Sequence, residues 1–319
     1  MSRITTNIDL VINTLKRGEI VAIPTETVYG LSANAENEEA IRKVYAVKNR
    51  PLTHPLIMHV AENWDLTAWV SFIPDYAYVL IEHFWPGPLT LVLPAKMKNV
   101  SPLITGGQET IALRCPSHPL AQTLLQKLDF PLVAPSANPF GKISPTTAEH
   151  VQQSFPEKEL LIWDGGRCQV GIESTILSAL NPQGFSILRQ GIIDELQLKT
   201  VLPEQQLPDN NTLRVPGKLA THYQPEKPLY CFPDLAAIKT FCQQNTLPVY
   251  VLSFSPLKAM DNQFYYQLPA NPTQVAFELY YQLRLADHSL ASCIAIELPP
   301  DEEPWAGVRE RILKAGQQI

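Results

Sequence analysis

The sequence has little charge of either sign and little cysteine. Of its 319 residues 18% are charged, and its five cysteines are far apart, with no C-x-x-C pair. This pattern excludes a disulfide scaffold and a cysteine-rich zinc site, and it predicts a reducing, cytoplasmic compartment. No run approaches the roughly 18 uncharged apolar residues of a membrane span, and residues 1–9 lack a basic-then-apolar leader pattern. We therefore expect no membrane segment.

A strong basic excess is also absent. The net charge is −6: there are 15 Lys and Arg against 17 Asp and Glu up to residue 190, and 10 against 14 after it. Neither half resembles a protein that coats duplex nucleic acid. One local basic patch exists, because residues 40–61 contain no acidic residue but include Arg42, Lys43, Lys48 and Arg50. A contact with RNA or a nucleotide would depend on such a patch.

Most of the common enzyme motifs are missing. The sequence contains no G-x-x-x-x-G-K-[ST], no G-x-G-x-x-G, no H-E-x-x-H and no G-x-S-x-G. These absences argue against a P-loop NTPase, a Rossmann oxidoreductase, a zinc protease and an α/β-hydrolase. His54 and His59 do not form a metal site either, because an extended chain would hold them about 17 Å apart.

Hydrophobic residues, 45% of the chain, are arranged in alternating helical and strand patterns. We expect helices over residues 8–16, 37–48, 64–69, 76–84, 117–128 and from 147, and strands over 20–23, 56–60, 89–93, 110–114, 132–134, 160–163, 174–177 and 186–189. This order predicts an α/β domain with a twisted mixed sheet over residues 1–196.

The pattern changes after that domain. Residues 197–227 are polar and interrupted by four prolines, which predicts a linker, and a loop of this length is usually functional or disordered. Strand and helix patterns restart over residues 228–319: strands over 229–232, 248–254 and 292–298, and helices over 234–243, 272–286 and 306–315. They predict a smaller Rossmann-like α/β domain with a parallel sheet.

Polar residues follow the predicted strands. Residues 24–31 carry two threonines and Glu26 directly after a buried strand, where ligands bind in α/β sheets, although a plain polar turn is equally compatible. Lys48 and Arg50 end a predicted helix. They either complement the helix dipole or clamp a phosphate, Lys as a point charge and Arg as a bidentate fork.

Arg114 ends an apolar strand, so its buried guanidinium needs an anion: Glu109, Asp164 or a substrate carboxylate. Ser136 and Asn138 follow another strand, and they can cap a turn or donate to a phosphate or a base. Ser144 lies in a segment that we expect to cap the helix from 147, and helix N-termini bind anions.

Together these segments resemble a known family, the threonylcarbamoyl-adenylate synthases of the YrdC-like fold. The resemblance rests on residues 24–31, Lys48-x-Arg50-Pro51 with 55–57, 85–90, Arg114-x-Pro116, 134–138 and 173–176, in matching order over about 20–190. The remainder resembles the longer, two-domain form, mainly through residues 221–225. Three places depart from the family pattern: Gln190 replaces a proline, His54 stands where we expect asparagine, and residues 308–311 only loosely resemble the closing segment of the family.

The resemblance implies an enzyme that makes threonylcarbamoyl-AMP from L-threonine, bicarbonate or CO₂, and ATP, releasing pyrophosphate. It implies Mg²⁺ bound with ATP without dedicated protein ligands. It also implies a partner complex that transfers the threonylcarbamoyl group to tRNA, with at most a weak direct contact between this chain and tRNA.

Roles for single residues follow from the same resemblance. Those expected around threonine are Thr27, His59, Arg114, Ala134 and Ser174. Those expected around the nucleotide are Lys48, Arg50, His54, Thr110, Ser136, Asn138, Ser144, Arg189 and Tyr223, with Tyr223 folding back from the linker as part of a lid. Lys48 and Arg50 are the expected catalytic residues. The role of Glu26, catalytic or structural, stays open at this point.

Two alternatives remain. The first is an RNA-binding or regulatory module without synthase activity, supported only by the basic patch over residues 40–61. The second is a carbamoyl-transferring domain of the kind fused into some hydrogenase-maturation proteins, which the lack of cysteine clusters disfavours.

Overall fold

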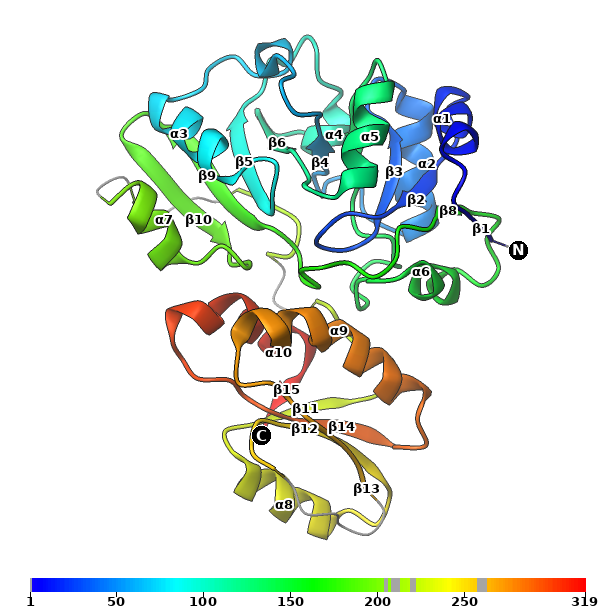
Figure 1. Cartoon of the computed structure of the whole chain (residues 1–319), viewed down its shortest axis with the longest axis vertical. Coiled ribbons are helices and arrows are strands. Elements are labelled where there is room, and N and C mark those ends of the chain that lie inside the picture. The colour runs from blue at the N-terminus through cyan, green and yellow to red at the C-terminus, as the bar shows by residue number, and fades with distance from the viewer. Residues whose placement is uncertain (1, 204–205, 208–212, 219–221, 257–262) are drawn as a thin grey trace. The chain divides into compact units, whose positions relative to one another are not determined.

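A computed structural model describes residues 2–203, 206–207, 213–218, 222–256 and 263–319 (Figure 1). The chain forms two compact units: residues 1–140 with 144–218, and residues 141–143 with 219–319. The change from the first unit to the second lies inside the predicted linker, residues 197–227, whose own limits stay a prediction.

The first unit is built on a ten-stranded sheet with the order β1-β8-β2-β3-β7-β4-β6-β5-β9-β10. The strands are β1 (Arg3–Thr5), β2 (Val21–Ile23), β3 (Gly30–Asn34), β4 (Ile57–His59), β5 (Leu89–Pro94), β6 (Thr110–Arg114), β7 (Leu132–Val133), β8 (Leu161–Trp163), β9 (Thr175–Asn181) and β10 (Gly184–Arg189). Four neighbouring pairs are parallel, namely β1/β8, β2/β8, β4/β6 and β5/β9, and the others are antiparallel. The predicted mixed sheet is confirmed.

Except for the helix that follows Pro74 without a side-chain cap, the helices of this unit begin after a residue whose side chain caps the first turn. They are α1 (Ile8–Lys16), α2 (Glu38–Lys48), η1 (Leu66–Ala68), α3 (Asp75–Phe84), α4 (Pro102–Thr105), α5 (Pro119–Lys127), α6 (Ala148–Ser154) and α7 (Glu195–Val201). Helix α2, for example, begins after Asn37, whose side chain accepts from the backbone of Glu39 and Ala40. It ends at Lys48 because Asn49 adopts the left-handed conformation, with φ 52°.

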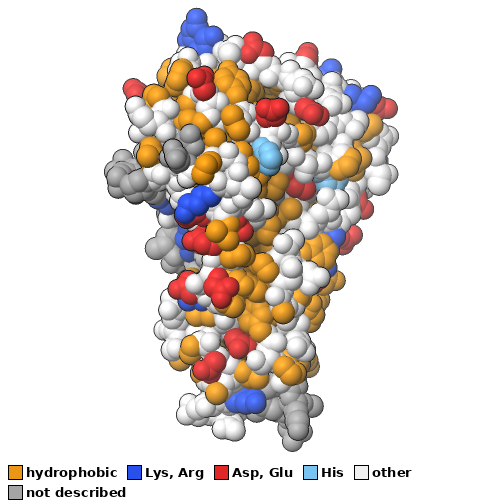
Figure 2. Space-filling model, turned by 60° about the vertical axis from the view of Figure 1, so that its left-hand side comes forward, with side chains coloured by type: hydrophobic (Ala, Val, Ile, Leu, Met, Phe, Trp, Pro, Cys, Tyr) orange, Lys and Arg blue, Asp and Glu red, His pale blue; other side chains and the backbone are white. Residues whose placement is uncertain are grey.

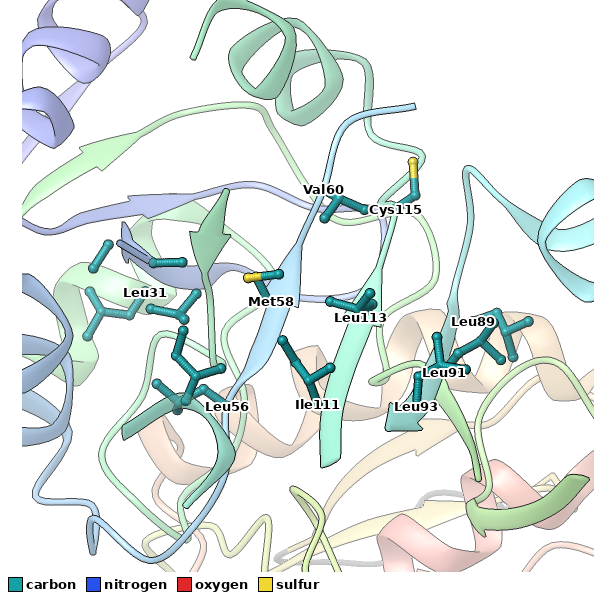
Figure 3. Close-up of a cluster of buried hydrophobic side chains, with 14 of the residues drawn as sticks. Leu31, Leu56, Met58, Val60, Leu89, Leu91, Leu93, Ile111, Leu113 and Cys115 are labelled. Carbon is teal, nitrogen blue, oxygen red and sulfur yellow. The ribbon is translucent and has the colours of Figure 1, made fainter. Parts of the chain in front are cut away.

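Apolar side chains from the central strands form the largest core. Leu31, Met58, Leu91 and Leu113 are each at most 1% exposed, and Figure 3 shows them beside one another on β3, β4, β5 and β6. At about 25 cal/mol per Å² of buried apolar surface, such a cluster stabilises the sheet strongly. The loops that carry the polar residues are therefore attached to a rigid platform.

The second unit contains a five-stranded parallel sheet with the order β13-β12-β14-β11-β15. Its elements are β11 (Leu229–Phe232), α8 (Leu235–Gln244), β12 (Val249–Ser253), β13 (Gln263–Gln267), α9 (Pro272–His288), β14 (Cys293–Glu297), η2 (Glu303–Trp305), α10 (Ala306–Ala315) and β15 (Gln317–Gln318). Figure 1 shows α8 on one face of this sheet and α9 with α10 on the other. The predicted small parallel α/β domain is confirmed.

Two local predictions are wrong. Residues 64–69 form only the short 3₁₀ turn η1. Helix α6 takes its N-cap from Thr147, so Ser144 does not cap it. Helix α7 extends to Val201, so it includes residues 197–201 of the predicted linker. The strands β1, β3, β13 and β15 were not predicted, because short or polar edge strands, and a strand inside a motif, give little periodicity.

Within the described ranges, none of the helices has the length and apolar character needed to cross a bilayer. The same residues contain no group of three His, Cys, Asp or Glu side chains arranged to hold a metal ion.

Candidate active site

The polar loops of the first unit bring several buried ionic side chains close to one another. Three groups are useful to name: the Arg114 cluster (Glu26, His59, Arg114), the Lys48 cluster (Lys48, Arg50, His54, Ser136, Asn138) and the Ser174 cluster (Thr90, Ser174, Arg189). Each joins residues that are far apart in the sequence.

The Arg114 cluster begins from the pairing of β4 with β6, which sets His59 beside Arg114. Glu26 reaches Arg114 from the loop after β2, with 2.6 Å between Oε1 and Nη2. The Arg114 Nε donates to the Gly87 carbonyl at 3.4 Å. Burial, followed by the charge of Arg114, lowers the pKa of His59 to about 3, so this imidazole is neutral at physiological pH.

The Lys48 cluster lies where α2 ends. The Lys48 side chain is 1% exposed, and its Nζ donates to the carbonyls of Ser136 and Asn138. Burial lowers the Lys48 pKa well below its ordinary value, the charge of Arg50 lowers it further, and Glu173 acts in the opposite direction. The ammonium group thus holds the loop after β7 against the end of α2. A role limited to the helix dipole would not need these two hydrogen bonds.

Arg50 is fixed by the loop that follows it. Its Nη2 donates to the Pro55 carbonyl at 2.8 Å and its Nε to the His54 carbonyl at 3.4 Å. The guanidinium carbon lies 5.5 Å from the centre of the Phe140 ring, which the His54 ring meets edge-on at 5.1 Å. Burial and the nearby Arg50 lower the pKa of His54.

The Ser174 cluster lies at the start of β9. The Ser174 hydroxyl is 2.7 Å from the Thr90 hydroxyl of the neighbouring strand β5. Arg189, the last residue of β10, donates through Nε and Nη2 to the Ser174 carbonyl, at 3.0 and 2.8 Å, and through Nη2 to the Ser174 hydroxyl at 3.1 Å. Its Nη1 donates to the Pro216 carbonyl at 3.0 Å. This arginine fixes both the backbone and the side chain of Ser174.

Glu173 connects two of these clusters. It precedes Ser174 in the chain, its carboxylate accepts from the Ser144 hydroxyl, and it influences the pKa of Lys48. Ser144 is fully buried. Glu173 thus adjoins Ser174 in the chain, binds Ser144, and acts on Lys48 through its charge.

Thr27 and Ala134 are held by backbone contacts. The Thr27 hydroxyl is 2.9 Å from that of Thr25, and the Thr27 carbonyl accepts from Gly171 at 3.1 Å. The Ala134 amide donates to the carbonyl of Ile57, the first residue of β4, at 3.2 Å. A Cβ on Gly30 would lie 3.0 Å from the Ala134 Cβ. Glycine at this position therefore lets the two backbone segments pack closely.

Two of the expected nucleotide residues belong to none of these clusters. Thr110 starts β6, at the opposite end from Arg114, which is about 13 Å along the strand. Tyr223 belongs to the second unit, where it is 1% exposed, stacks on Tyr280 and lies under the Arg311 guanidinium. Thr221, part of the motif that suggested Tyr223, lies outside the described residues, as do residues 204–205 and 208–212 of the predicted linker.

The ionic partner of Arg114 differs from the expectation. From the sequence, Glu109 and Asp164 were the candidate protein partners, whereas the structure pairs Arg114 with Glu26. The contacts of Glu173 and Phe140 were not predicted. Glu26 and Glu173 both lie in motifs on which the family resemblance rests, residues 24–31 and 173–176. Those motifs were the only feature of the sequence that could have pointed to them.

The site as a whole carries more positive than negative charge. Four cations, Lys48, Arg50, Arg114 and Arg189, are each at most 9% exposed, against two similarly buried carboxylates, Glu26 and Glu173. Buried cations in such excess favour anionic ligands. The three clusters also lack a serine or cysteine nucleophile paired with a base. The site therefore suits the positioning and charge stabilisation of anions better than covalent catalysis.

Comparisons with known proteins identify the family. Residues 13–191 match the family described as "Telomere recombination", and residues 193–316 match the "Threonylcarbamoyl-AMP synthase, C-terminal domain" family. The threonylcarbamoyl-AMP synthase of Bacillus subtilis is 38% identical over 313 residues, which is 94% of this chain and 90% of that protein. The Pyrococcus abyssi enzyme of the same name is 40% identical over 66% of this chain and 63% of its own length.

The solved structures include a close neighbour. The crystal structure of Pyrococcus abyssi Sua5 complexed with L-threonine superposes with a TM-score of 0.88 at 33% identity, covering 98% of this chain and 96% of that one. Both parts of the chain thus have counterparts in a single relative. The chain belongs to the threonylcarbamoyl-AMP synthase family of enzymes.

Proposed function

We propose that this enzyme forms L-threonylcarbamoyladenylate from L-threonine, bicarbonate or CO₂, and ATP, with release of pyrophosphate. The observation that carries this proposal is the excess of buried cations over carboxylates in the first unit. The reaction brings together the carboxylate of an amino acid, a carbamate and a triphosphate. These anions repel one another in water, so they need fixed positive groups to approach.

The threonine would bind to the Arg114 and Ser174 clusters. Arg114 would hold the carboxylate, Ser174 and Thr27 would approach the hydroxyl and amine, and the neutral His59 and the backbone of Ala134 would complete the wall. Support comes from the burial of these groups, since a charged hydrogen bond out of water is worth about 1.5–3 kcal/mol. The match to a relative solved with L-threonine is consistent with this assignment.

The nucleotide would bind to the Lys48 cluster. Lys48 and Arg50 would face the phosphates as the catalytic residues, with Ser136, Asn138, Ser144 and Arg189 around them. His54 and Thr110 would lie at the margin, and Tyr223 would close over the nucleotide. The hydrogen bonds from Lys48 to the loop after β7 support this grouping, because they already join an ammonium group to the Ser136–Asn138 segment.

The chemistry then needs two steps. In the first, the threonine amine forms a C–N bond with the carbon of bicarbonate, and water leaves to give a carbamate. In the second, a carbamate oxygen attacks the α-phosphorus of ATP in line, the bond to the bridging oxygen breaks, and pyrophosphate departs. The carbamate decays in water, so holding both ligands in one dry site is the main task of the protein.

A divalent cation, Mg²⁺, would enter with ATP. Phosphate oxygens and water supply most ligands of such an ion, so the donor set of the site, rich in cations and with only two carboxylates, fits an ion carried by the nucleotide. Lys48 and Arg50 would share with it the task of offsetting the phosphate charge.

The product would pass to a separate complex that modifies tRNA. On the face in Figure 2, the described Lys and Arg side chains are scattered among acidic ones, which supports at most a weak direct contact with tRNA. All five cysteines are free and buried, which supports a reducing, cytoplasmic compartment.

One assay tests the proposal. The protein is incubated with ATP, Mg²⁺ and bicarbonate, with or without L-threonine, and pyrophosphate is measured together with threonylcarbamoyladenylate by mass spectrometry. We expect both products only when threonine is present. Pyrophosphate release at the same rate with and without threonine would refute the proposed function. Binding of tRNA without any turnover would instead favour the RNA-binding alternative.

A further inference from the structure

Glu26 and Arg114 form an ion pair that is almost completely out of water. Their side chains are 2% and 5% exposed, and 2.6 Å separates Oε1 of Glu26 from Nη2 of Arg114. Breaking such a pair by removing one partner would leave an uncompensated buried charge. An anion that replaces one partner avoids that cost.

The Glu26 carboxylate makes few other contacts. Neither of its oxygens accepts a hydrogen bond from the described residues, and both are shielded from solvent. Its backbone, in contrast, is anchored, because the Val170 amide donates to the Glu26 carbonyl at 2.7 Å and the Gly171 amide to the Thr27 carbonyl at 3.1 Å. The position of the loop therefore does not depend on the ion pair of the side chain.

The other titratable groups nearby are poor proton acceptors. Burial and Arg114 lower the pKa of His59 to about 3. Burial raises the pKa of the Cys115 thiol to about 12, and it raises that of Cys168 as well. The Nδ1 atom of His118 already accepts from the Leu120 amide as the cap of α5. Glu26 is thus the carboxylate in position to take a proton beside Arg114.

We propose that Glu26 occupies Arg114 until the carboxylate of the amino-acid substrate replaces it, and that Glu26 then accepts the proton of the substrate ammonium group. This inference rests on the proposed function, because it requires that threonine binds at Arg114. The carboxylate and the ammonium of an amino acid are attached to the same carbon. A substrate held by Arg114 therefore brings its ammonium next to the displaced Glu26.

The proton balance is simple. An N–H bond of the ammonium breaks, an O–H bond forms on a Glu26 oxygen, and the electron pair stays on nitrogen. That pair forms the C–N bond with bicarbonate, which loses water to leave the carbamate. Glu26 returns its proton to solvent when the product leaves and pairs with Arg114 again. The base becomes available only after the substrate has bound, so the empty site keeps its charges paired.

Two variants test this role, with Glu19→Gln as the matched control, since Glu19 forms an exposed ion pair with Lys43. Threonine affinity is measured by calorimetry, and turnover by pyrophosphate release between pH 6.5 and 9.5. For Glu26→Gln we expect an unchanged or tighter threonine Kd, because Arg114 has lost its competitor. We also expect kcat to fall by about 10²–10⁴-fold. The deficit should narrow at high pH, where the amine loses its proton unaided.

The second variant, Glu26→Asp, keeps the charge on a shorter side chain. We expect a normal fold, measured by circular dichroism, and a kcat between those of wild type and Glu26→Gln. A wild-type kcat for both variants, or a loss of threonine binding equal to the loss of kcat, would overturn the proposal. If the wild-type enzyme itself shows no threonine-dependent turnover while calorimetry still detects threonine, the proposed function has failed rather than the role of Glu26.

Discussion

His59 and Arg114 occupy paired positions on the neighbouring parallel strands β4 and β6. The imidazole is 2% exposed, and its Nδ1 accepts no hydrogen bond within the described part of the chain. A positive charge on His59 would therefore be both desolvated and repelled by the guanidinium. The register of β4 and β6 thus decides that His59 is uncharged. The sequence alone does not reveal this charge state.

This relationship predicts a pH dependence of stability. The folded pKa of His59, about 3, lies below the unfolded value of about 6.5. The unfolded chain thus binds the additional proton between these values, so the His59 contribution is complete above about pH 6.5 and is lost as the pH falls. The free energy of unfolding should fall by about 1.4 kcal/mol per pH unit from this residue alone.

Urea unfolding of wild type and His59→Gln between pH 4 and 8 measures that contribution. The difference between the two proteins should shrink steadily below pH 6.5. His83→Gln, at an exposed position, serves as the control and should follow wild type. Parallel curves for wild type and His59→Gln would show that His59 does not titrate as described.

Replacement of Lys48 should slow turnover more than it affects folding. Lys48→Met keeps most of the apolar stem and removes the charge near the proposed phosphates, so we expect a loss of about 10²–10³-fold in kcat. Lys43→Met, on the same helix but paired with Glu19 at the surface, should retain wild-type kcat. Pyrophosphate release measures both. A Lys48→Met enzyme with normal kcat would remove Lys48 from the catalytic residues.

Replacement of Arg114 should affect threonine more than ATP, and because Glu26 loses its buried partner, it should also lower the stability of the fold. Arg114→Ala removes a charged hydrogen bond worth about 1.5–3 kcal/mol, which corresponds to a rise in the threonine KM of up to about 10²-fold. The KM for ATP should change much less. Arg42→Ala, an exposed arginine paired with Glu38, is the control. Steady-state kinetics with each substrate varied in turn separates the two effects, and an unchanged threonine KM would contradict the assignment.

A methyl group at Gly191 should disturb the Ser174 cluster. A Cβ there would lie 2.3 Å from the Thr175 backbone nitrogen, so we expect Gly191→Ala to cost about 1–3 kcal/mol of stability. It should also lower kcat, because Arg189 holds Ser174 from two residues earlier. Gly107→Ala is the control, because its Cβ would lie in open space and only the left-handed backbone, with φ 79°, would be strained. It should lower the free energy of unfolding by about 1 kcal/mol without affecting kcat. Equal effects of both changes on kcat would contradict this view.

The local elements with strong periodicity could be predicted from the sequence. Helix α2 has a capping asparagine, acidic residues in its first turn and Lys48 in its last, and the apolar runs of β5 and β6 mark buried strands. Thr147 as the cap of α6 and the strand β3 could not be predicted as readily. In both segments, tertiary contacts selected one of several compatible local structures.

The candidate site was predictable as a set of residues but not as an arrangement. The motifs named Lys48, Arg114 and Ser174, because charged and hydroxyl groups next to apolar strands are unusual in sequence. They could not identify Glu26 as the partner of Arg114, since the two are 88 positions apart and two other carboxylates were equally plausible.

The sequence by itself determined the two-part α/β organisation, the buried strands and the chemical types available for binding anions. Only the tertiary structure decided which charges neutralise one another, which imidazole stays uncharged, and that Glu173 accepts a hydrogen bond from Ser144. The physical reason is that periodicity and capping act over a few residues. Electrostatic energy and desolvation depend instead on distance in space, which the chain acquires only when its distant segments pack together.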